Sequence, residues 1–393
     1  MTVTVRFLHT ADWQLGKPFA GIQDPEKRAL VRQERLAVLD RIGQAARESG
    51  ASFIVVAGDL FDSASPTRST VAAACSAIGR MGLPVYAIPG NHDHGGPGSL
   101  WEQDFFRREC AALAPNFQLL LKPEPVELPQ AVLFPCPLLR RSESTDPTAW
   151  LRDGEVFAGL PEGKPRIVIA HGSVQGFGSA ADDDEGETGG PGNLLDLDRL
   201  NPAAWDYIAL GDWHGTKLLS ARAAYSGTPE PDRFSKGESN EPGHVLAVEA
   251  ERGGPPVISR IRTARLGWHR AARHFSEDAA LESFQTEIAE LLGQRGHQDL
   301  LRLELSGSLG LAAASELEKM LDSWRARLLR LKLLDRTRVA PGPEETARLM
   351  SRAEDPVTGR VAARLAALAQ GEDENAAVAR VALRELHAAC MDG

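Results

Sequence analysis

The amino-acid sequence predicts an α/β protein in which two β-sheets form a sandwich flanked by helices. Short runs of aliphatic, β-branched and aromatic residues, which are typical of buried strands, alternate with helical stretches through the first half of the chain. In residues 126–137, and again in residues 221–262, the pattern changes to short strands and turns. Helices early and strand pairs later favour two sheets with helices outside, followed here by a smaller α/β module and a helical tail.

The elements of the first half follow in order. Residues 25–49 have apolar side chains at nearly helical spacing, and Pro25 suits the first position of a helix. Residues 66–81 predict a second, small and apolar helix. The runs that predict buried strands are residues 5–8, 53–57, 85–88, 167–170 and 207–210.

Polar side chains stand where each of these strand runs ends. Because ligands of open α/β sheets bind at the carboxyl ends of the strands, we expect these side chains to face one site. The clusters are Asp12 with Gln14, Asp59, Asn91-His92-Asp93, His171, and Asp212 with His214.

The residue types at this site indicate metal chemistry. Oxygen and imidazole ligands without any thiolate suit Mn²⁺, Mg²⁺ or Fe²⁺ better than a structural zinc. Two ions are expected, because the candidate ligands exceed the needs of one tetrahedral site and Asp59 has two oxygens with which to bridge a pair. Such a pair clamps a phosphoryl group and makes hydroxide available near neutral pH.

The clusters resemble, in order and spacing, the motifs of calcineurin-like metallophosphoesterases, whose fold is the expected two-sheet sandwich. Within that superfamily the chain looks most like the DNA-repair exonuclease branch, the bacterial SbcD-type nuclease subunit. The branch resemblance depends on residues 9–12, on residues 225–229 (YSGTP) and on the small domain that follows. The matching segments are 9–16 (HTADWQLG), 58–62 (GDLFD), 90–93 (GNHD), 170–172 (AHG) and 211–214 (GDWH).

The resemblance implies a role for each matched residue. One ion would be held by Asp12, Asp59 and His214, and a second by Asp59, Asn91, His171 and Asp212, with Asp59 bridging the two. His92 resembles the family histidine that stabilises the scissile phosphate or protonates the leaving oxygen. Asp93 is expected to orient His92 through its other ring nitrogen. The expected nucleophile is a metal-bridged hydroxide.

Two positions depart from the family pattern. Gln14 and Asp212 stand where the family usually has histidine. Fewer imidazoles and one more carboxylate make the site harder, which favours Mn²⁺, with Mg²⁺ as the alternative, over zinc. Gln14 can still offer an amide oxygen as a weak ligand. The alternative is a decayed, non-catalytic site.

Composition and charge set limits on location and partners. The net charge of −10 argues against strong DNA binding by this chain alone, since proteins that grip DNA alone usually carry a basic face. Four cysteines without paired spacing predict reduced thiols. The absence of a signal-peptide pattern and of a long apolar run predicts a cytoplasmic protein without membrane contact.

The chain is expected to divide into three parts. Residues 1–265 would form the metallophosphoesterase (nuclease) domain, and residues 266–340, with β-α-β-α-β order, an α/β module that resembles the capping domain of SbcD-type nucleases. Residues 341–393 would form a helical C-terminal region. In the module a set of arginines either contacts phosphate or forms a solvated face: Arg325, Arg327, Arg330, Arg336 and Arg338.

Two segments have competing interpretations. The acidic run at residues 182–185 is expected to be a solvated loop, with a gating role near the metal site as the alternative. In residues 375–391 one apolar stripe either packs on the chain's own module or docks the SMC-like, SbcC-type coiled-coil ATPase with which family members work. A homodimer is a further option.

The function expected from these observations is hydrolysis of DNA phosphodiesters by an exonuclease or endonuclease subunit. A small-molecule phosphodiesterase or phosphatase is the alternative, and a non-catalytic or weakly active partner of an ATPase is the third. Near the site, His9 is expected to be a buried structural histidine, and Trp13 and Trp213 to wall the metal loops. Lys17 contacts either phosphate or solvent.

Overall fold

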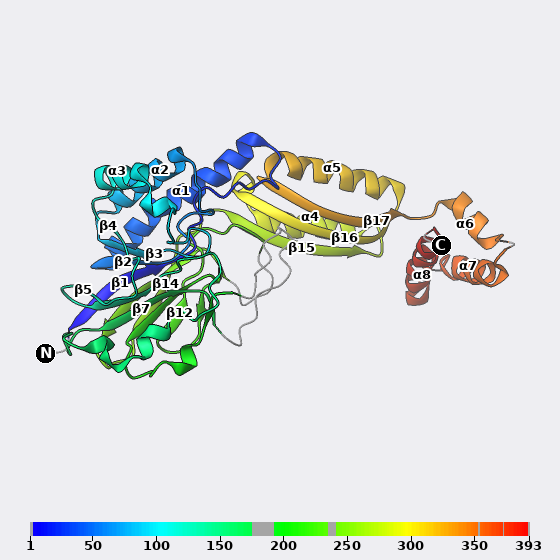
Figure 1. Ribbon diagram of the computed structural model, residues 1–393. Helices are drawn as coiled ribbons and strands as arrows, with labels where there is room; N and C mark the ends of the chain where they lie inside the picture. Colours follow the sequence, from blue (N-terminus) through cyan, green and yellow to red (C-terminus); the bar gives the residue numbers. More distant parts are fainter. Residues whose placement is uncertain (1–2, 175–191, 235–240, 353, 372, 392–393) are drawn as a thin grey trace. The chain divides into compact units, whose positions relative to one another are not determined.

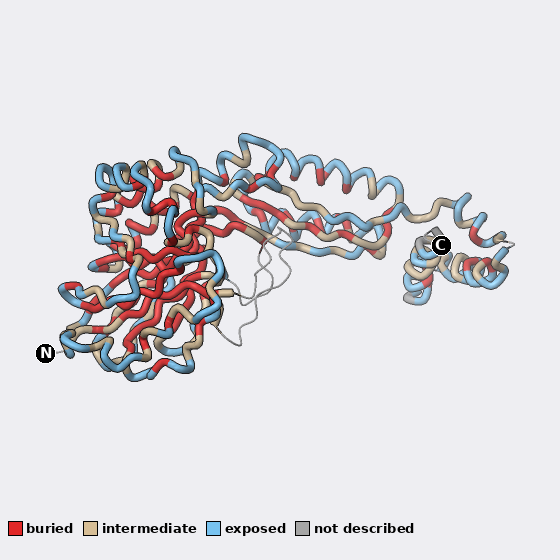
Figure 2. Tube along the Cα trace, viewed as in Figure 1, coloured by how far each residue is buried: buried red, intermediate tan, exposed pale blue. Residues whose placement is uncertain are grey.

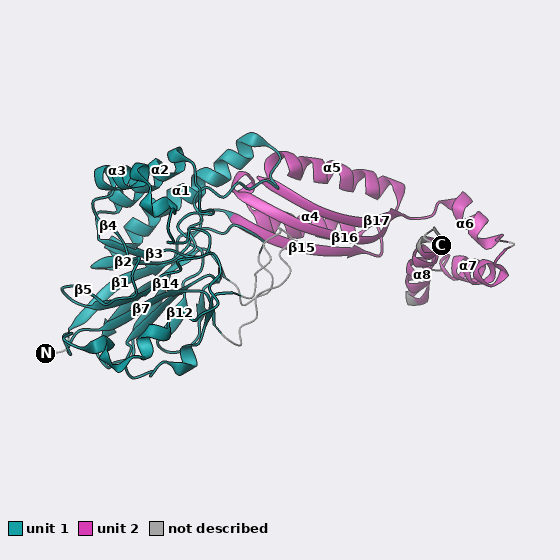
Figure 3. Cartoon of the chain, viewed as in Figure 1, with its two compact units in different colours: residues 1–266 teal, residues 267–393 magenta. Residues whose placement is uncertain are grey.

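The structure, a computed structural model, describes residues 3–174, 192–234, 241–352, 354–371 and 373–391. The predicted acidic loop at residues 182–185 lies outside these ranges. The chain divides into two compact units, residues 1–266 and 267–393 (Figure 3). In the described part of the chain, no helix combines the length and the apolar character that a bilayer span requires.

Two mixed six-stranded sheets form the centre of the first unit (Figure 1). The first has the order β14 (Val257–Arg262), β13 (His244–Glu251), β1 (Thr4–Thr10), β2 (Phe53–Ala57), β3 (Val85–Ile88), β4 (Phe117–Leu119). The second has the order β11 (Lys217–Leu218), β12 (Ala223–Tyr225), β10 (Tyr207–Gly211), β7 (Arg166–His171), β6 (Val132–Cys136), β5 (Val126–Glu127). A small pair, β8 (Ser173–Val174) and β9 (Leu194–Leu195), accompanies them.

Alternation along the strands explains why the sheets stack. In β1, Val5 and Phe7 enter a buried cluster with Ile167 and Ile169 of β7, whereas Leu8 points to the other face and packs under helices. The central strands of both sheets are therefore buried on two faces, as the tube in Figure 2 shows for the centre of this unit. The predicted two-sheet α/β fold is confirmed.

Helices α1 (Pro25–Glu48) and α2 (Arg68–Met81) cover the first sheet, close to the predicted ranges. Asp24 caps α1 by accepting from the amides of Glu26 and Lys27, and Thr67 caps α2 by accepting from the amide of Thr70. Helix α3 (Asp104–Leu113) was not predicted from the sequence. Single 3₁₀ turns occur at Leu100–Glu102, Ala149–Arg152, Gly154–Phe157, Leu197–Arg199 and, in the second unit, Gly296–Gln298.

The second unit contains a parallel sheet, β15 (Gly267–Phe275), β16 (Asp299–Leu309) and β17 (Arg330–Val339), in that order. Helices α4 (Ala280–Leu292) and α5 (Leu311–Arg327) form the two crossovers, which confirms the predicted β-α-β-α-β order. Both helices share one core with the sheet, through Phe284 and Trp324 against Leu303 and Leu305.

The chain then continues with α6 (Pro343–Met350), α7 (Pro356–Leu368) and α8 (Glu374–Met391), as predicted. In the predicted apolar stripe of helix α8, Val381, Ala382 and Leu386 are half-buried, whereas Val378 is 64% exposed. Arg384 of α8 donates to the carbonyl of Ser308 at the end of β16. The stripe is therefore only partly covered by the chain's own second unit.

Candidate metal centre

The backbone at the strand ends is strained where the predicted ligands lie. Asp12, Gln14, Asp59 and Asp212 have φ values of 53°, 42°, 55° and 101°, in the left-handed region that residues other than glycine seldom adopt. Asp12, Asp59 and Asp212 lie one or two residues after a strand, and Gln14 lies four residues after β1, so the chain turns soon after each strand ends. Strain of this kind concentrates at functional sites, where it holds side chains in a set direction.

Glycines beside the ligands make the close approach of the strands possible. A Cβ at Gly90 would lie 2.1 Å from Oδ1 of Asp59, and one at Gly58 would lie 2.2 Å from Nδ1 of His171. A Cβ at Gly211 would lie 2.0 Å from the carbonyl oxygen of Ala57. Only glycine fits at these three positions, which explains why glycine precedes Asp59, Asn91 and Asp212.

Three predicted ligands meet in a buried cluster. Asp12, Asp59 and His171 each offer one ligand atom, and these atoms lie within 4.8 Å of one another. The Oδ1 atom of Asn91 is 2.9 Å from Nε2 of His171, and Oδ1 of Asp212 is 3.9 Å from the same nitrogen. The Nδ1 atom of His171 donates to the carbonyl of Ala57 at 2.7 Å, which leaves Nε2 facing the oxygen ligands.

The electrostatics of this cluster fit a bound cation. Burial, with repulsion from Asp59 and Asp212, raises the pKa of Asp12 to about 6 against the attraction of His214 and His171. Burial lowers the pKa of His171, but Asp59, Asp12 and Asp212 outweigh it and bring that pKa to about 9. Carboxylates thus outnumber the cations around them, and a divalent ion at these ligands would neutralise the excess.

His92 is oriented differently from the prediction. Its Nδ1 atom donates to the carbonyl oxygen of Asp62 at 2.8 Å, not to the carboxylate of Asp93. The expected orienting role of Asp93 toward His92 is therefore wrong. The Nε2 atom of His92 lies 3.9 Å from Oδ2 of Asp59, on the side of the ring that faces the ligands.

Asp93 is engaged by the backbone instead. Its Oδ2 atom accepts from the amides of Leu60 and Phe61 at 2.8 and 3.1 Å, and its Oδ1 atom accepts from Gly90 at 2.8 Å. The carboxylate is 1% exposed and joins the loop after β2 to the loop after β3. The family resemblance predicted that Asp93 pairs with His92. In the structure both oxygens of Asp93 instead accept hydrogen bonds from three backbone amides.

The remaining predicted ligands, His214 and Gln14, form a ring with Asp232 and Lys17 through hydrogen bonds and one ion pair. Nδ1 of His214 is 3.0 Å from Oδ1 of Asp232, and Nε2 of His214 is 3.2 Å from the amide nitrogen of Gln14. The amide oxygen of Gln14 accepts from Nζ of Lys17 at 3.0 Å, and this ammonium lies 2.9 Å from Oδ2 of Asp232. Lys17, which was expected at phosphate or in solvent, closes the ring.

Charge and hydrogen bonding compete at His214. Burial lowers its pKa, whereas Asp232 raises it, and the pKa reaches about 9. The oxygen of Gln14 is turned toward Lys17, so its NH₂ group faces Nε2 of His214. This contact requires a neutral His214, although Asp232 favours the protonated imidazolium, and the geometry of the contact decides for the neutral ring. In this structure the lone pair of His214 and the oxygen of Gln14 are both engaged in hydrogen bonds within the protein.

Deeper contacts support the loop after β1. The buried Arg35 donates to the carbonyls of Gln14 and Glu230 and to Oγ1 of Thr228. Thr228 in turn donates to the carbonyl of Asp12 at 2.9 Å. This contact explains the position of the threonine in residues 225–229.

The neighbouring aromatic side chains have structural roles. His9 is fully buried and bonded to the hydroxyl of Tyr207 and the carbonyl of Leu210, as predicted. Trp13 is buried, and its indole donates to Thr10. Trp213 lies under the ammonium of Lys217, 5.2 Å from the ring centre.

Two contributors were missed from the sequence. Asp62 was visible as the last residue of GDLFD, but its carbonyl, not its side chain, holds His92. Asp232 carried no recognisable signal, because it lies after a turn, distant in the chain from both Lys17 and Gln14. Only the fold brings it to His214.

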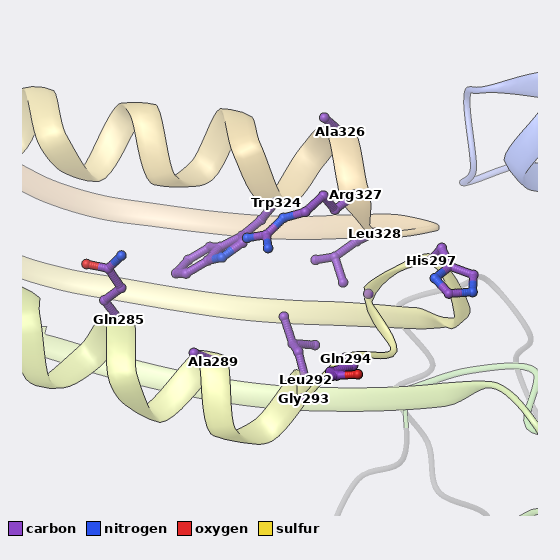
Figure 4. A pocket seen from close by; sticks show the side chains of 11 residues that line it. Gln285, Ala289, Leu292, Gly293, Gln294, His297, Trp324, Ala326, Arg327 and Leu328 are labelled. Atoms are coloured by element: carbon purple, nitrogen blue, oxygen red, sulfur yellow. The ribbon is translucent and has the colours of Figure 1, made fainter.

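A separate cavity of about 590 Å³ lies in the second unit beside α4 and α5 (Figure 4). Its lining includes Gln285, Leu292, His297, Trp324 and Arg327. Trp324 packs edge-on against Phe284 with ring centres 5.7 Å apart, which marks it as a core residue of this unit. The predicted metal ligands all belong to the first unit, so this cavity is not the metal centre.

Two stacked sheets with a buried carboxylate and imidazole cluster at their strand ends define the class of metal-dependent phosphoesterases. The family model for the calcineurin-like phosphoesterases matches residues 5–216, and the chain belongs to this family. One solved crystal structure aligns with 67% of this chain and 100% of its own length, at 13% identity and a TM-score of 0.38.

Proposed function

We propose that this chain hydrolyses phosphodiester bonds of DNA, as a nuclease subunit in DNA repair or processing. Family membership and the cluster of Asp12, Asp59 and His171 fit a metal-dependent phosphoesterase. The observation that favours DNA over a small ester is a basic face on the sheet of the second unit. Its positive charges are repeated along the face, so a polyanion such as DNA can contact several of them at once, whereas a small ester cannot.

The basic face is defined by alternate residues of β17. Arg330, Lys332, Arg336 and Arg338 are separated by even numbers and therefore share one face of the strand. Leu331 and Leu333 point to the other face, where they pack against the core under α4 and α5. The basic residues thus lie on the face that the helices do not cover.

The neighbouring strands extend this face. Arg302 of β16 is the register partner of Lys332, and Arg270 of β15 is the partner of Arg302. Glu304 is the acidic residue among them, 2.9 Å from Arg302 and 3.7 Å from Arg270. Of the five arginines proposed for phosphate contact, Arg325 and Arg327 lie elsewhere, on α5.

The first unit would supply the chemistry. A divalent ion at the cluster, for which we propose Mn²⁺ or Mg²⁺ because no thiolate is present, supplies Lewis acidity and a hydroxide near neutral pH. His92 presents Nε2 toward the ligands, where it binds a phosphoryl oxygen or protonates the leaving oxygen. Asp59 accepts from the amide of His92 at 3.0 Å and so couples the two groups.

The test compares two substrates. The purified protein with Mn²⁺ is given labelled single- and double-stranded DNA and, in parallel, bis-p-nitrophenyl phosphate. The variant Arg336→Glu with Arg338→Glu should weaken DNA cleavage and lower the salt slope of binding by about 2, while hydrolysis of the small ester is unchanged. The matched control is Arg325→Glu, which removes an exposed arginine paired with Asp322 on α5.

The outcome decides between the alternatives. Cleavage of the small ester alone would favour a small-molecule phosphodiesterase or phosphatase. No hydrolysis of either substrate with any divalent ion would favour a non-catalytic subunit.

A coiled-coil ATPase of the SMC type is part of the proposal, as is a cytoplasmic location. Support comes from α7, where Val357, Val361 and Leu368 lie at helical spacing and are 62%, 44% and 47% exposed. For the location, support comes from the sequence, in which four cysteines lie without paired spacing, a pattern typical of reduced thiols.

A further inference from the structure

We propose that the metal centre holds a single divalent ion, at the cluster of Asp12, Asp59 and His171, and that the ammonium of Lys17 takes the place of the second. This differs from the pair of ions that the family resemblance implies. The second ion would need His214 and Gln14 as ligands in addition to the aspartates. Both side chains are committed to other partners.

The lone pair of His214 already accepts a hydrogen bond. Its Nδ1 atom lies 3.0 Å from Oδ1 of Asp232 and carries the proton that this carboxylate accepts. The acceptor electrons are therefore on Nε2, and the amide nitrogen of Gln14 donates to them at 3.2 Å. A metal ion would need these same electrons.

The amide of Gln14 cannot turn over to become a ligand while Lys17 is present. Its oxygen accepts from Nζ of Lys17 at 3.0 Å. A rotation by half a turn would bring the amide N–H groups against the ammonium, donor facing donor. Lys17 thus determines which end of the amide faces His214.

Lys17 is itself held in place. Its ammonium lies 2.9 Å from Oδ2 of Asp232 and 3.6 Å from Oδ1 of Asp62, and its side chain is 13% exposed. Asp232 is 1% exposed and binds both ends of the ring, Lys17 through one oxygen and His214 through the other. The ring Lys17–Gln14–His214–Asp232 is therefore closed by three hydrogen bonds and by the ion pair between Lys17 and Asp232.

Charge reinforces this arrangement. A second divalent ion at Gln14 and His214 would lie beside a fixed ammonium, which repels it in a poorly solvated site. The ammonium already supplies a positive charge to the carboxylates there. Around Asp59 no lysine ammonium is seen among the described residues; the Nε2 atom of His171 lies 3.6 Å from Oδ2 of Asp59 and 2.9 Å from Oδ1 of Asn91.

The test counts ions and does not depend on activity. Metal-free wild-type protein is titrated with Mn²⁺ by equilibrium dialysis with elemental analysis, and the bound ions are examined by electron paramagnetic resonance. We expect saturation at about one ion per chain with the spectrum of an isolated Mn²⁺. Binding of a second ion of comparable affinity, with the spectrum of an exchange-coupled pair, would overturn the proposal.

Variants test the role assigned to Lys17. Lys17→Met combined with Gln14→His removes the ammonium and restores an imidazole, so the count should rise to about two ions and the coupled spectrum should appear. Lys122→Met with Gln44→His, two exposed positions of the same unit, is the matched control and should bind like the wild type. If the first variant also binds a single ion, Lys17 does not exclude the second.

The single variant Lys17→Met carries the same test if the double variant does not fold, because Gln14 is then able to turn its oxygen toward a second ion. Metal binding identical to that of the wild type would contradict the inference. The inference rests on the proposed metal-dependent function but not on DNA as substrate. A chain that binds one ion and leaves DNA intact refutes only the substrate, and one that binds two and cleaves DNA refutes only the ion count.

Discussion

Asp93 offers a sharp test of whether a conspicuous site residue acts in the chemistry or in the scaffold. Its two oxygens accept three buried backbone amides, those of Leu60, Phe61 and Gly90. In Asp93→Asn one oxygen still serves Leu60 and Phe61, but the new NH₂ group faces the amide of Gly90. One hydrogen bond is lost and a buried donor is left unmatched, which should cost about 1–3 kcal/mol of unfolding free energy.

Asp93→Ala removes both acceptor oxygens and so all three hydrogen bonds, which should cost about 3–6 kcal/mol, at roughly 1–2 kcal/mol for each orphaned amide. Urea unfolding followed by circular dichroism measures both losses. Asp40→Asn is the matched control, because Asp40 forms an exposed pair with Arg80 and its loss should stay within about 1 kcal/mol.

Activity separates the two roles. If Asp93 supports the loops, Asp93→Asn should lower stability, and its turnover should stay well above that of His92→Ala. An Asp93→Asn protein as stable as the wild type, yet as slow as His92→Ala, would refute this reasoning. Asp93 would then act through His92 after all.

Three further predictions concern the site, the core and the tail. Asp59→Asn should abolish metal-dependent hydrolysis, whereas His92→Ala should lower turnover about 10²-fold or more with metal content intact by elemental analysis. Burial lowers the pKa of His9 from 6.5 to about 3. Between these two pH values His9 is therefore protonated in the unfolded chain but neutral in the folded chain. Between pH 6.5 and pH 5 this group should cost about 2 kcal/mol of stability, a loss that denaturation of His9→Gln should not show. Deleting residues 375–393 should leave basal hydrolysis but prevent co-purification with the ATPase; aggregation of the truncated chain would instead assign this helix to its own fold.

Local patterns in the sequence determined the elements and the set of candidate ligands. Apolar periodicity and helix-start residues such as Pro25 depend on a few neighbouring positions, so the ranges of α1 and α2 were predictable to within a few residues. The candidate ligands could be recognised because polar residues that follow parallel strands lie at the carboxyl ends of those strands, where ligands of α/β sheets bind. Helix α3 escaped prediction, and no side-chain hydrogen bond caps its start.

The tertiary structure alone decided how those side chains are used. A hydrogen-bonding group is assigned by its nearest partner in space, and for His214 and Gln14 the partners that matter are Asp232 and Lys17. Asp93 likewise accepts hydrogen bonds from backbone amides, and no sequence pattern indicates these contacts. Short sequence motifs identify the candidate ligands. Which of their lone pairs remain for a metal ion depends on contacts between segments that are distant in the chain. Those contacts form only when the two sheets stack.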